Sequence, residues 1–522
     1  MLISDTETTL SLLQDRAGLS PDTVFARYEQ ETLTVAELYE QAGKTAASLS
    51  EFGIKPGDRV GVMLDNSLDY VVLYYALIWL GAIQVPVNTR LRHSALKYLV
   101  DHAGPVLIIA ESGYLAHLQE AQCNLSAVKI LSHIKETGSS WKLADSTCLS
   151  LAATPSVPVE SKGSDVLFIM YTSGTTGPPK GVLVTDKMFR ASAYAASLSS
   201  DARDGDILAI WEPLYHIGAA QLLTIPLKFD VELNFIGAFS ASRFWGKVRS
   251  IKATHIHFLG GILQILLRQP ANPLDQQHGC RIAWGGGAPV SVAKEFEARF
   301  NIQVREIYGM TEASSFTSIN SDGHKGSVGQ AAPYFEVRIV DSNGGALAPL
   351  MHGEITVRGL EPGLITPGYY NDEQATQNTI RDQWLYTGDL GYFDKNNYLY
   401  YAGRVKESIR RRGENISAWE IERVVEILEF VEQAAAIGIP DEMGDEEIKL
   451  IVKLSKEMSI SDDSKGSLQQ QIFNWCTQQL PEFQVPRYLA LIEEFPLTGT
   501  QRIRKELLSK TTEDCFEIQK DT

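Results

Sequence analysis

The sequence has few cysteines and no long apolar run. Its five cysteines are odd in number, widely spaced and without a C-x-x-C pair, which excludes a disulfide framework and a zinc ribbon and fits a reducing compartment. The most apolar segment, Tyr70 to Ile83, has 14 residues, whereas a membrane span needs about 20. The first residues carry an acid where a signal peptide carries basic residues. We therefore expect a cytoplasmic protein with no transmembrane segment.

Basic residues are in the minority, with 47 Lys and Arg against 64 Asp and Glu and a net charge of −17. This balance argues against a broad nucleic-acid surface, so no nucleic-acid partner is expected. An anionic small molecule remains compatible with it, because such a ligand meets a pocket and not the net charge. A chain of 522 residues with 44% hydrophobic residues predicts one large globular domain and a smaller one.

Helical and extended patterns alternate along the first four hundred or so residues. The predicted strands are Arg59–Leu64, Pro105–Ala110 and Val166–Met170, and residues 67–82 are a predicted buried helix. Short apolar strands separated by helices favour an α/β fold with parallel sheets covered by helices.

The pattern changes near residue 403, where a basic segment bounded by Gly403 and Gly413 is a predicted hinge. An amphipathic helix over residues 418–430 and a strand over Ile448–Leu454 are expected behind it. The prediction is an N-terminal domain of residues 1–403 and a small α+β domain of residues 404–522.

A loop rich in Ser, Thr and Gly follows the strand at residues 166–170. Its glycines let backbone N–H groups approach an anion, its hydroxyls donate hydrogen bonds, and its lysine supplies a point charge for phosphate oxygens. The candidate phosphate-binding residues are Thr172, Ser173, Gly174, Thr175, Thr176, Gly177 and Lys180. The spacing fails the G-x-x-x-x-G-K-[ST] pattern, and a mobile linker is the alternative interpretation.

The loop resembles the signature loop of the adenylate-forming, AMP-binding enzymes, which include acyl-CoA synthetases, peptide-synthetase adenylation domains and firefly luciferases. Further segments resemble that family's motifs in the same order: Gly285–Pro289, Tyr308–Glu312, Tyr386–Asp389, Gly403–Arg404 and Gly413–Ser417. The resemblance spans nearly the whole chain. It implies a large N-terminal adenylate-forming domain of several subdomains and a small, mobile α+β C-terminal domain.

The resemblance also implies residue roles. Tyr308 is expected to pack on adenine, Thr311 to meet the α-phosphate and Glu312 to help hold Mg²⁺. For Glu312 the alternative is an ordinary helix-start carboxylate, which the helix dipole favours.

Other implied contacts lie before and after this segment. Gly286, Gly287 and Ala288 are expected to line the adenine and acyl pocket. Asp389 is expected to accept hydrogen bonds from the ribose hydroxyls, with Arg404 as the basic partner. A simple turn acid is the alternative for Asp389.

The implied reaction has two steps and uses ATP, Mg²⁺ and CoA. A carboxylic acid is a poor electrophile, so ATP converts it to an acyl-adenylate with loss of pyrophosphate, and a thiol then takes the acyl group. Cations and oriented N–H groups must spread the charge of the two approaching anions. Lys406 matches the family's hinge residue, although it can equally be a solvated lysine.

The expected function is therefore that of an AMP-forming acyl-CoA synthetase, with a small carboxylic acid and CoA as partners. A ligase that loads a carrier-protein pantetheine is one alternative. A degenerate nucleotide- or acyl-CoA-binding protein is another.

Two positions depart from the family pattern. Family members normally place a lysine, which bridges the carboxylate and the α-phosphate, where this chain has Arg502. Three interpretations are open. Arg502 performs the bridging task more slowly, Lys505 takes the place of the missing lysine, or adenylation is impaired while thioester formation survives. We favour the interpretation in which Arg502 performs the task. The second departure is Asp186, where acyl-CoA synthetases often have a histidine.

The acyl site is expected near His216, which resembles the family's gating position, and near Gly260, in a turn after the strand that begins at Thr254. His255 and His257 share one face of that strand by its period of two. Ordinary packing is the preferred interpretation of this pair, and a metal site is the alternative.

The acid itself is less clearly indicated. Residues 239–248 are similar to crotonobetaine/carnitine-CoA ligases. Aromatic faces and a carboxylate can hold a trimethylammonium group, and the candidates for such a cage are Trp211, Glu212, Tyr215 and Trp284. We prefer to interpret these residues as pocket packing and a surface acid, and a medium-chain or small branched acid suits an apolar pocket equally well.

Overall fold

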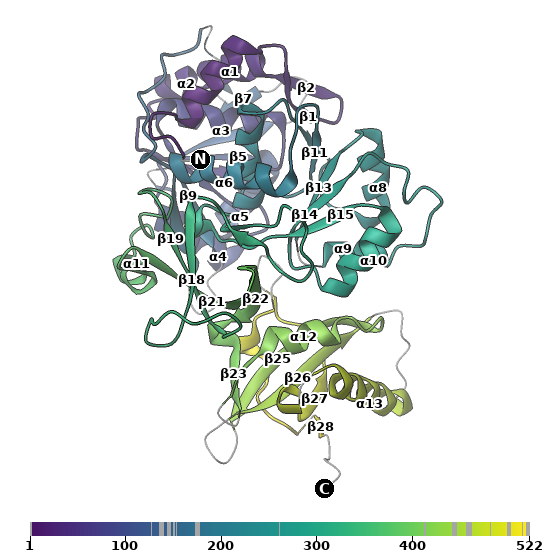
Figure 1. The fold of residues 1–522 in the computed structure, drawn as a ribbon. Coiled ribbons are helices and arrows are strands. Elements are labelled where there is room, and N and C mark those ends of the chain that lie inside the picture. The colour runs from purple at the N-terminus through teal and green to yellow at the C-terminus, as the bar shows by residue number, and fades with distance from the viewer. Residues whose placement is uncertain are drawn as a thin grey trace. The chain divides into compact units, whose positions relative to one another are not determined.

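The chain folds into two compact units in the computed structural model (Figure 1). The structure describes residues 3–126, 128–134, 140–143, 148–149, 152, 154–172, 178–259, 261–411, 414–440, 446–455, 462–480, 482–497, 503–513 and 515–517. Unit 1 comprises Met1–Val337 and Val357–Leu385, and unit 2 comprises Arg338–Thr356 and Tyr386–Thr522. The division at residue 403 stays a prediction, because compactness does not show which part of the chain moves.

A seven-stranded sheet positions most of the candidate site in unit 1. Its order is β15-β14-β13-β11-β12-β1-β2. The bounds are β1 Val24–Tyr28, β2 Glu31–Thr34, β11 Ile207–Ile210, β12 Glu232–Phe235, β13 His255–Leu259, β14 Ile282–Gly286 and β15 Gln303–Glu306. All neighbours are parallel except β1 and β2. The segments that follow β11, β13, β14 and β15 therefore leave the sheet at one edge.

Helices cover both faces of this sheet. Those on one face are α8 (Ala241–Ser250), α9 (Ile262–Leu267) and α10 (Val290–Phe300), which lie beside β13–β15 in Figure 1. Aromatic side chains of α8 and α10 and leucines of α9 pack in one cluster with Ile256 and Phe258 of β13. Because side chains alternate along a strand, His255 and His257 point to the other face, where α6 (Asp186–Ser200) lies and His255 Nε2 is 2.9 Å from the Ser200 carbonyl oxygen.

The second large sheet of unit 1 has eight strands, in the order β10-β9-β4-β3-β5-β6-β7-β8. Its bounds are β3 Arg59–Met63, β4 Ile83–Pro86, β5 Leu107–Glu111, β6 Lys129–Ile134, β7 Ser140–Leu143, β8 Cys148–Leu149, β9 Val166–Thr172 and β10 Lys180–Thr185. The three predicted strands are β3, β5 and β9, each shifted by two residues or fewer. β9 and β10 are antiparallel and place Thr172 opposite Lys180, at the two ends of the Ser/Thr/Gly loop.

The predicted buried helix is α3 (Leu68–Leu80), which begins after the N-cap Ser67 and is buried along almost its whole length. Its 13 residues belong to the core of unit 1. In the described part of the chain, no helix is long and apolar enough to cross a membrane. The other helices of unit 1 are α1 Thr9–Leu19, α2 Val35–Glu51, α4 His93–Ala103, α5 Leu115–Glu120, α7 Ile217–Ala220 and α11 Glu373–Thr379.

Three strands cross the boundary between the units, namely β18 Phe335–Val340, β19 Gly353–Gly359 and β21 Trp384–Phe393. Within unit 1, β20 (Ile380–Arg381) pairs with the first residues of β21. Within unit 2, β22 (Leu399–Arg404) pairs with the later residues of β21, and this pairing places Asp389 opposite Arg404.

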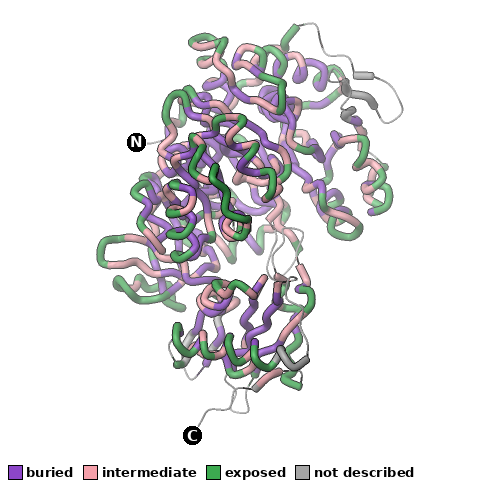
Figure 2. The backbone as a smooth tube through the Cα atoms, turned by 90° about the vertical axis from the view of Figure 1, so that its right-hand side faces the viewer, coloured by how far each residue is buried: buried purple, intermediate pink, exposed green. Residues whose placement is uncertain are grey.

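Unit 2 has the predicted small α+β architecture. A sheet in the order β25-β26-β27-β28 and the ribbon β23-β24 pack with two helices. The bounds are β23 Ser408–Arg411, β24 Glu414–Ser417, α12 Ala418–Val425, β25 Val431–Pro440, β26 Glu446–Leu454, α13 Asp462–Gln479, β27 Tyr488–Leu491 and β28 Phe516–Glu517. α12 ends five residues before the predicted helix does, and β26 starts two residues before the predicted strand. Buried residues follow the central strands and exposed ones the turns (Figure 2).

Asp186, the departure noted after the loop, is a structural acid. Its Oδ1 accepts a hydrogen bond from Arg190 Nε at 2.6 Å, and its Oδ2 accepts one from the Thr9 backbone N–H at 2.8 Å. Arg190 Nη1 donates to the Ser4 carbonyl oxygen. Both charged side chains are buried, so the pair ties the N-terminal segment to the start of α6.

We predict that Asp186→Ala lowers the free energy of unfolding of unit 1 by about 3–5 kcal/mol, because it leaves a buried guanidinium without its carboxylate. Urea denaturation followed by tryptophan fluorescence measures the loss. Asp186→Asn keeps an acceptor for Thr9 N–H and should lose less, and the exposed Asp15→Ala is the control at about 0.5 kcal/mol or below. Equal losses for Asp186→Ala and Asp15→Ala would contradict this assignment.

Candidate active site

A glycine turn follows β14 and is held closed by an acid from the next strand. A Cβ on Gly285 would lie 1.8 Å from the Phe258 carbonyl oxygen, so only glycine lets β14 approach β13 there. Gly287 has φ +91°. Its N–H and that of Ala288 both donate to Glu306 Oε1 at 3.1 Å. The predicted pocket-lining turn thus has a fixed backbone.

The segment after β15 is equally well anchored. Tyr308 is buried, its carbonyl oxygen accepts hydrogen bonds from the N–H groups of Thr317 and Ser318, and its own N–H donates to Ser318 Oγ at 2.8 Å. Thr311 begins the short 3₁₀ helix η3 (Thr311–Ala313). The three residues of this segment that were predicted to meet ATP and Mg²⁺ lie together at the edge of the sheet.

Glu312 is a buried carboxylate with a phenol partner. Tyr369 Oη donates to Glu312 Oε1 at 2.9 Å, and Lys180 Nζ lies 4.7 Å from the centre of the Tyr369 ring. Burial, and then the Glu312 carboxylate, raise the pKa of Tyr369 well above its ordinary value, so the phenol remains a donor. Tyr369 therefore joins the predicted phosphate-binding lysine to the predicted metal-binding acid.

The donor set suits Mg²⁺ that arrives with a nucleotide. Mg²⁺ is usually held by one or two carboxylates together with phosphate oxygens and water. No group of three or more His, Cys, Asp or Glu side chains able to hold a metal occurs among the described residues. Glu312 fits as the protein's carboxylate, and its orientation is fixed by Tyr369.

In unit 2, the predicted ribose acid pairs with its predicted basic partner. Asp389 Oδ1 lies 2.8 Å from Arg404 Nε, and the carboxylate is 4% exposed. Its N–H donates to Thr387 Oγ1, which in turn donates to the Ile355 carbonyl oxygen. Asp389 is thus a buried strand residue, not the turn acid of the alternative interpretation.

Lys505 is held within unit 2 by two acids. Its Nζ lies 2.7 Å from Glu407 Oε2 and 2.7 Å from Glu422 Oε1. Burial raises the pKa of Glu422 to about 7, and the Lys505 ammonium opposes that rise. This geometry disfavours Lys505 as the replacement for Arg502, because the ammonium would first have to leave both carboxylates.

Several predicted residues lie outside the described part of the chain, namely Ser173, Gly174, Thr175, Thr176, Gly177, Gly260 and Arg502. Lys406 belongs to the 3₁₀ helix η4 (Val405–Glu407), but its side chain is not among those that the structure describes. The roles of these residues stay predictions.

The acyl segment after β11 contains an unexpected buried pair. Glu212 is 3% exposed, so its interpretation as a surface acid is wrong. Its Oε1 lies 2.6 Å from His257 Nδ1. The His257 ring packs edge-on against Trp284 at 4.5 Å between ring centres. Packing is thus confirmed for Trp284, while Glu212 is tied to an imidazole.

Neighbouring residues of the acyl segment are also fixed. His216 immediately precedes α7, and its ring lies 4.6 Å from that of Tyr215. Trp211 Nε1 donates to the His257 carbonyl oxygen at 2.8 Å. His255 has a partner at each ring nitrogen, Thr254 Oγ1 at 2.8 Å and the Ser200 carbonyl oxygen. Its interpretation as a packed histidine is therefore supported.

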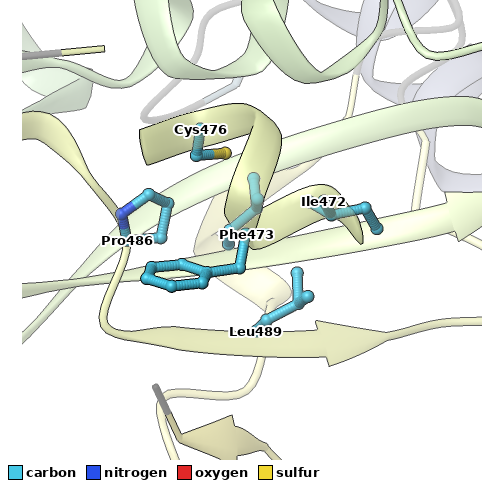
Figure 3. A pocket seen from close by; sticks show the side chains of 6 residues that line it. Ile472, Phe473, Cys476, Pro486 and Leu489 are labelled. Atoms are coloured by element: carbon cyan, nitrogen blue, oxygen red, sulfur yellow. The ribbon is translucent and has the colours of Figure 1, made fainter. Parts of the chain in front are cut away.

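A small hollow lies between α13 and β27 in unit 2 (Figure 3). It is lined by Leu450, Ile472, Phe473, Cys476, Pro486 and Leu489. Burial raises the pKa of the Cys476 thiol to about 12, so this sulfur is not a ready nucleophile. The hollow offers hydrocarbon surface and no feature of a reaction site.

Sequence reasoning missed Tyr369, Glu306 and the Glu212–His257 pair. Glu306 and Glu212 stand at or just beyond the ends of parallel strands, which is a signal that could have placed them at this edge. Tyr369 had no such signal, because it lies 57 residues from Glu312.

Comparison with known proteins shows the family. Residues 13–370 match the family described as AMP-binding enzyme, and residues 420–502 match the AMP-binding enzyme C-terminal domain. A 2-succinylbenzoate–CoA ligase of Bacillus cereus is 29% identical over 513 residues, which cover 97% of this chain and 99% of that enzyme.

Solved structures agree with the fold. O-succinylbenzoate CoA synthetase from Bacillus subtilis, in complex with its acyl-adenylate intermediate, superposes with a TM-score of 0.81 at 25% identity, covering 98% of this chain and 99% of that one. The same enzyme with ATP and magnesium gives 0.80 at 26% identity, covering 95% and 98%. The α/β adenylate-forming fold with a large N-terminal and a smaller C-terminal part is confirmed.

We predict that Tyr369→Phe raises the Mg²⁺ concentration needed for half-maximal ATP–pyrophosphate exchange by about 10- to 100-fold, the usual cost of losing a residue that orients a metal ligand. The phenyl ring preserves the contact with Lys180, so the KM for ATP at saturating Mg²⁺ should change less. Tyr370→Phe removes a neighbouring hydroxyl and is the control. An unchanged Mg²⁺ requirement in Tyr369→Phe would show that the phenol does not orient Glu312.

Proposed function

The chain belongs to the family of AMP-binding enzymes, and we propose that the acid it activates is an aromatic keto acid of the 2-succinylbenzoate type. The chain is an AMP-forming acid–CoA ligase. ATP and a carboxylic acid give an acyl-adenylate and pyrophosphate, and CoA then takes the acyl group with release of AMP.

The observation that carries the choice of acid is the end-to-end match to 2-succinylbenzoate–CoA ligases, over 97% of this chain. An acid of that type needs a pocket with aromatic walls and some polar groups. The aromatic side chains of Trp284 and Phe316 lie 5.6 Å apart beside the His257 ring, and they support such a pocket.

The chain's own residues perform distinct tasks in the proposed mechanism. Lys180 attracts phosphate oxygens, and Tyr308 offers a fixed aromatic ring for adenine. Glu312, oriented by Tyr369, would hold Mg²⁺, and the ion would supply positive charge that neutralises the phosphates. Thr311 hydrogen-bonds the α-phosphate during attack by the acid's carboxylate oxygen.

The remaining proposed roles concern the nucleotide's sugar and the acid. Asp389 accepts the ribose hydroxyls beside Arg404. Gly286, Gly287 and Ala288 let the ligands approach the backbone closely, and His216 borders the acyl part. Arg502 bridges the carboxylate and the α-phosphate, and Lys406 acts at the hinge. A cytoplasmic location stays a prediction.

A trimethylammonium acid of the crotonobetaine type is the second candidate. It rests on the similarity of residues 239–248 to crotonobetaine/carnitine-CoA ligases. The geometry favours it less, because the Glu212 carboxylate that would attract the cation is bonded to His257.

We predict that ATP–pyrophosphate exchange depends on 2-succinylbenzoate and that added CoA yields its thioester and AMP. Radiolabelled pyrophosphate incorporation measures the first step, and chromatography of the thioester the second. Benzoate and succinate, the two halves of the acid, are matched controls and should support little exchange. Exchange with crotonobetaine alone would establish the second candidate, and conversion of a supplied acyl-adenylate without any exchange would show impaired adenylation.

The choice of thiol is tested in the same reaction. CoA should accept the acyl group from the adenylate, whereas an acyl-carrier protein with attached pantetheine should not compete with it. Transfer to the carrier protein alone would establish the carrier-loading alternative.

We predict that Arg502→Ala lowers the exchange rate by about 10²–10³-fold, the usual cost of removing one group that stabilises the transition state. Arg502→Lys should raise the rate, because a compact ammonium fits between two oxygens better than a planar fork does. Thioester formation from supplied acyl-adenylate should be unchanged in both variants. A rate unaffected by Arg502→Ala would assign the bridging task to another cation.

A further inference from the structure

His257 has one ring nitrogen that the fold leaves without a partner. Its Nδ1 lies 2.6 Å from Glu212 Oε1. Its Nε2 is buried and has no hydrogen-bond partner among the described residues. The side chain as a whole is 3% exposed. A buried polar atom that stays unpaired costs folding free energy, so the unpaired Nε2 of His257 requires an explanation. His255 requires none, because both of its ring nitrogens have partners.

The pair is built as a rigid unit. The Asn66 side chain donates to the Glu212 carbonyl oxygen at 2.7 Å and accepts from the Leu214 N–H at 2.8 Å. One side chain therefore holds the backbone from Glu212 to Leu214. The Glu212 carboxylate in turn accepts from Nδ1–H and fixes the plane of the His257 ring. The direction in which Nε2 points is thus set by the fold.

Gly218 lies beside the ring. A Cβ built on Gly218 would be in ordinary van der Waals contact with His257 Cε1 and Glu212 Oε2, each at 4.0 Å, so the missing side chain leaves the space of one methyl group there. His257 also lies on β13, two residues before the strand's carboxyl end and opposite Trp284 of β14, the strand that leads into the glycine turn. Ligands of open α/β sheets bind at this edge. The unpaired nitrogen therefore lies beside a position without a side chain, on a strand that runs toward this edge.

We propose that His257, held by Glu212, is a specificity-determining residue that hydrogen-bonds a neutral oxygen on the acyl part of the acid, such as a ketone. This inference rests on the proposed acid–CoA ligase function and deepens it. Nε2–H donates to the ketone oxygen when the ring carries both protons, and the adjacent Glu212 carboxylate balances that charge. A purely hydrocarbon acyl chain of the same length would leave the nitrogen unpaired and is discriminated against.

Matched acids that differ only at this oxygen test the proposal. One pair is 4-oxo-4-phenylbutanoate and 4-phenylbutanoate. The other is 2-succinylbenzoate and 2-(3-carboxypropyl)benzoate, in which CH₂ replaces the ketone. The wild-type enzyme should prefer the keto acid of each pair by about 10- to 100-fold in kcat/KM for ATP–pyrophosphate exchange, the range expected for a hydrogen bond to a buried group.

His257→Asn is the decisive variant. Asparagine can place a nitrogen where Nδ1 bonds Glu212 and has no atom in the place of Nε2, so folding is preserved and the proposed donor is lost. The preference for the keto acid should fall to about onefold to threefold, with little change for the methylene acid. His255→Asn, on the same strand and face, is the matched control and should leave the preference unchanged.

The outcomes are distinct. A wild-type preference near one, or a His257→Asn variant that keeps the wild-type preference, overturns the inference while the ligase function stands. No exchange with any of the four acids overturns both the proposed acid and the inference. Loss of the preference in His257→Asn with retention in His255→Asn supports it.

Discussion

Parallel pairing in the seven-stranded sheet is the constraint on which the site of unit 1 depends. β11, β13, β14 and β15 pair in register, with His255 beside Ile282 and Ile282 beside Gln303. Strands that run in one direction deliver their following segments to one edge. Position relative to the strand end therefore decides which side chains meet, and distance along the chain matters less.

Close approach of β13 and β14 gives this edge its shape. Gly285 has no side chain because the Phe258 carbonyl oxygen occupies the place of a Cβ. The amides of Gly287 and Ala288, which follow, would be unpaired if Glu306 did not accept from them. One short glycine run and one acid thus create a turn whose backbone is fixed before any ligand binds, and a preorganised turn needs no ordering upon binding.

Sequence reasoning worked where the signal is local. The apolar segment that forms α3 is too short to span a membrane and too apolar for a helix on the protein surface. The sequence therefore predicts a buried helix. α12 was predicted too long because Leu428 and Phe430 continue its apolar spacing; they pack against the same core from the turn that leads into β25.

Partners distant in the chain escaped prediction. Glu212 was interpreted as a surface acid because isolated glutamates are rarely buried. Its buried carboxylate pairs with His257, 45 residues away. Its carbonyl oxygen accepts a hydrogen bond from Asn66, 146 residues away. Asp186 shows the same limitation, since its partner Thr9 lies 177 residues earlier. Such pairings follow from the assembled sheets and not from any local pattern.

The buried carboxylates of the sheet edge have partners of different kinds, and the partner decides what each acid can do. Glu306 accepts two backbone N–H groups and closes a turn. Glu212 fixes an imidazole. Glu312 is bonded by a phenol, which orients a carboxylate without neutralising it. A cation attached to phosphate is the natural counter-charge for such an acid. The net charge of −17 therefore says little about how an anionic nucleotide is accepted, because these buried acids are bonded within the fold and the Glu312 carboxylate is positioned by Tyr369.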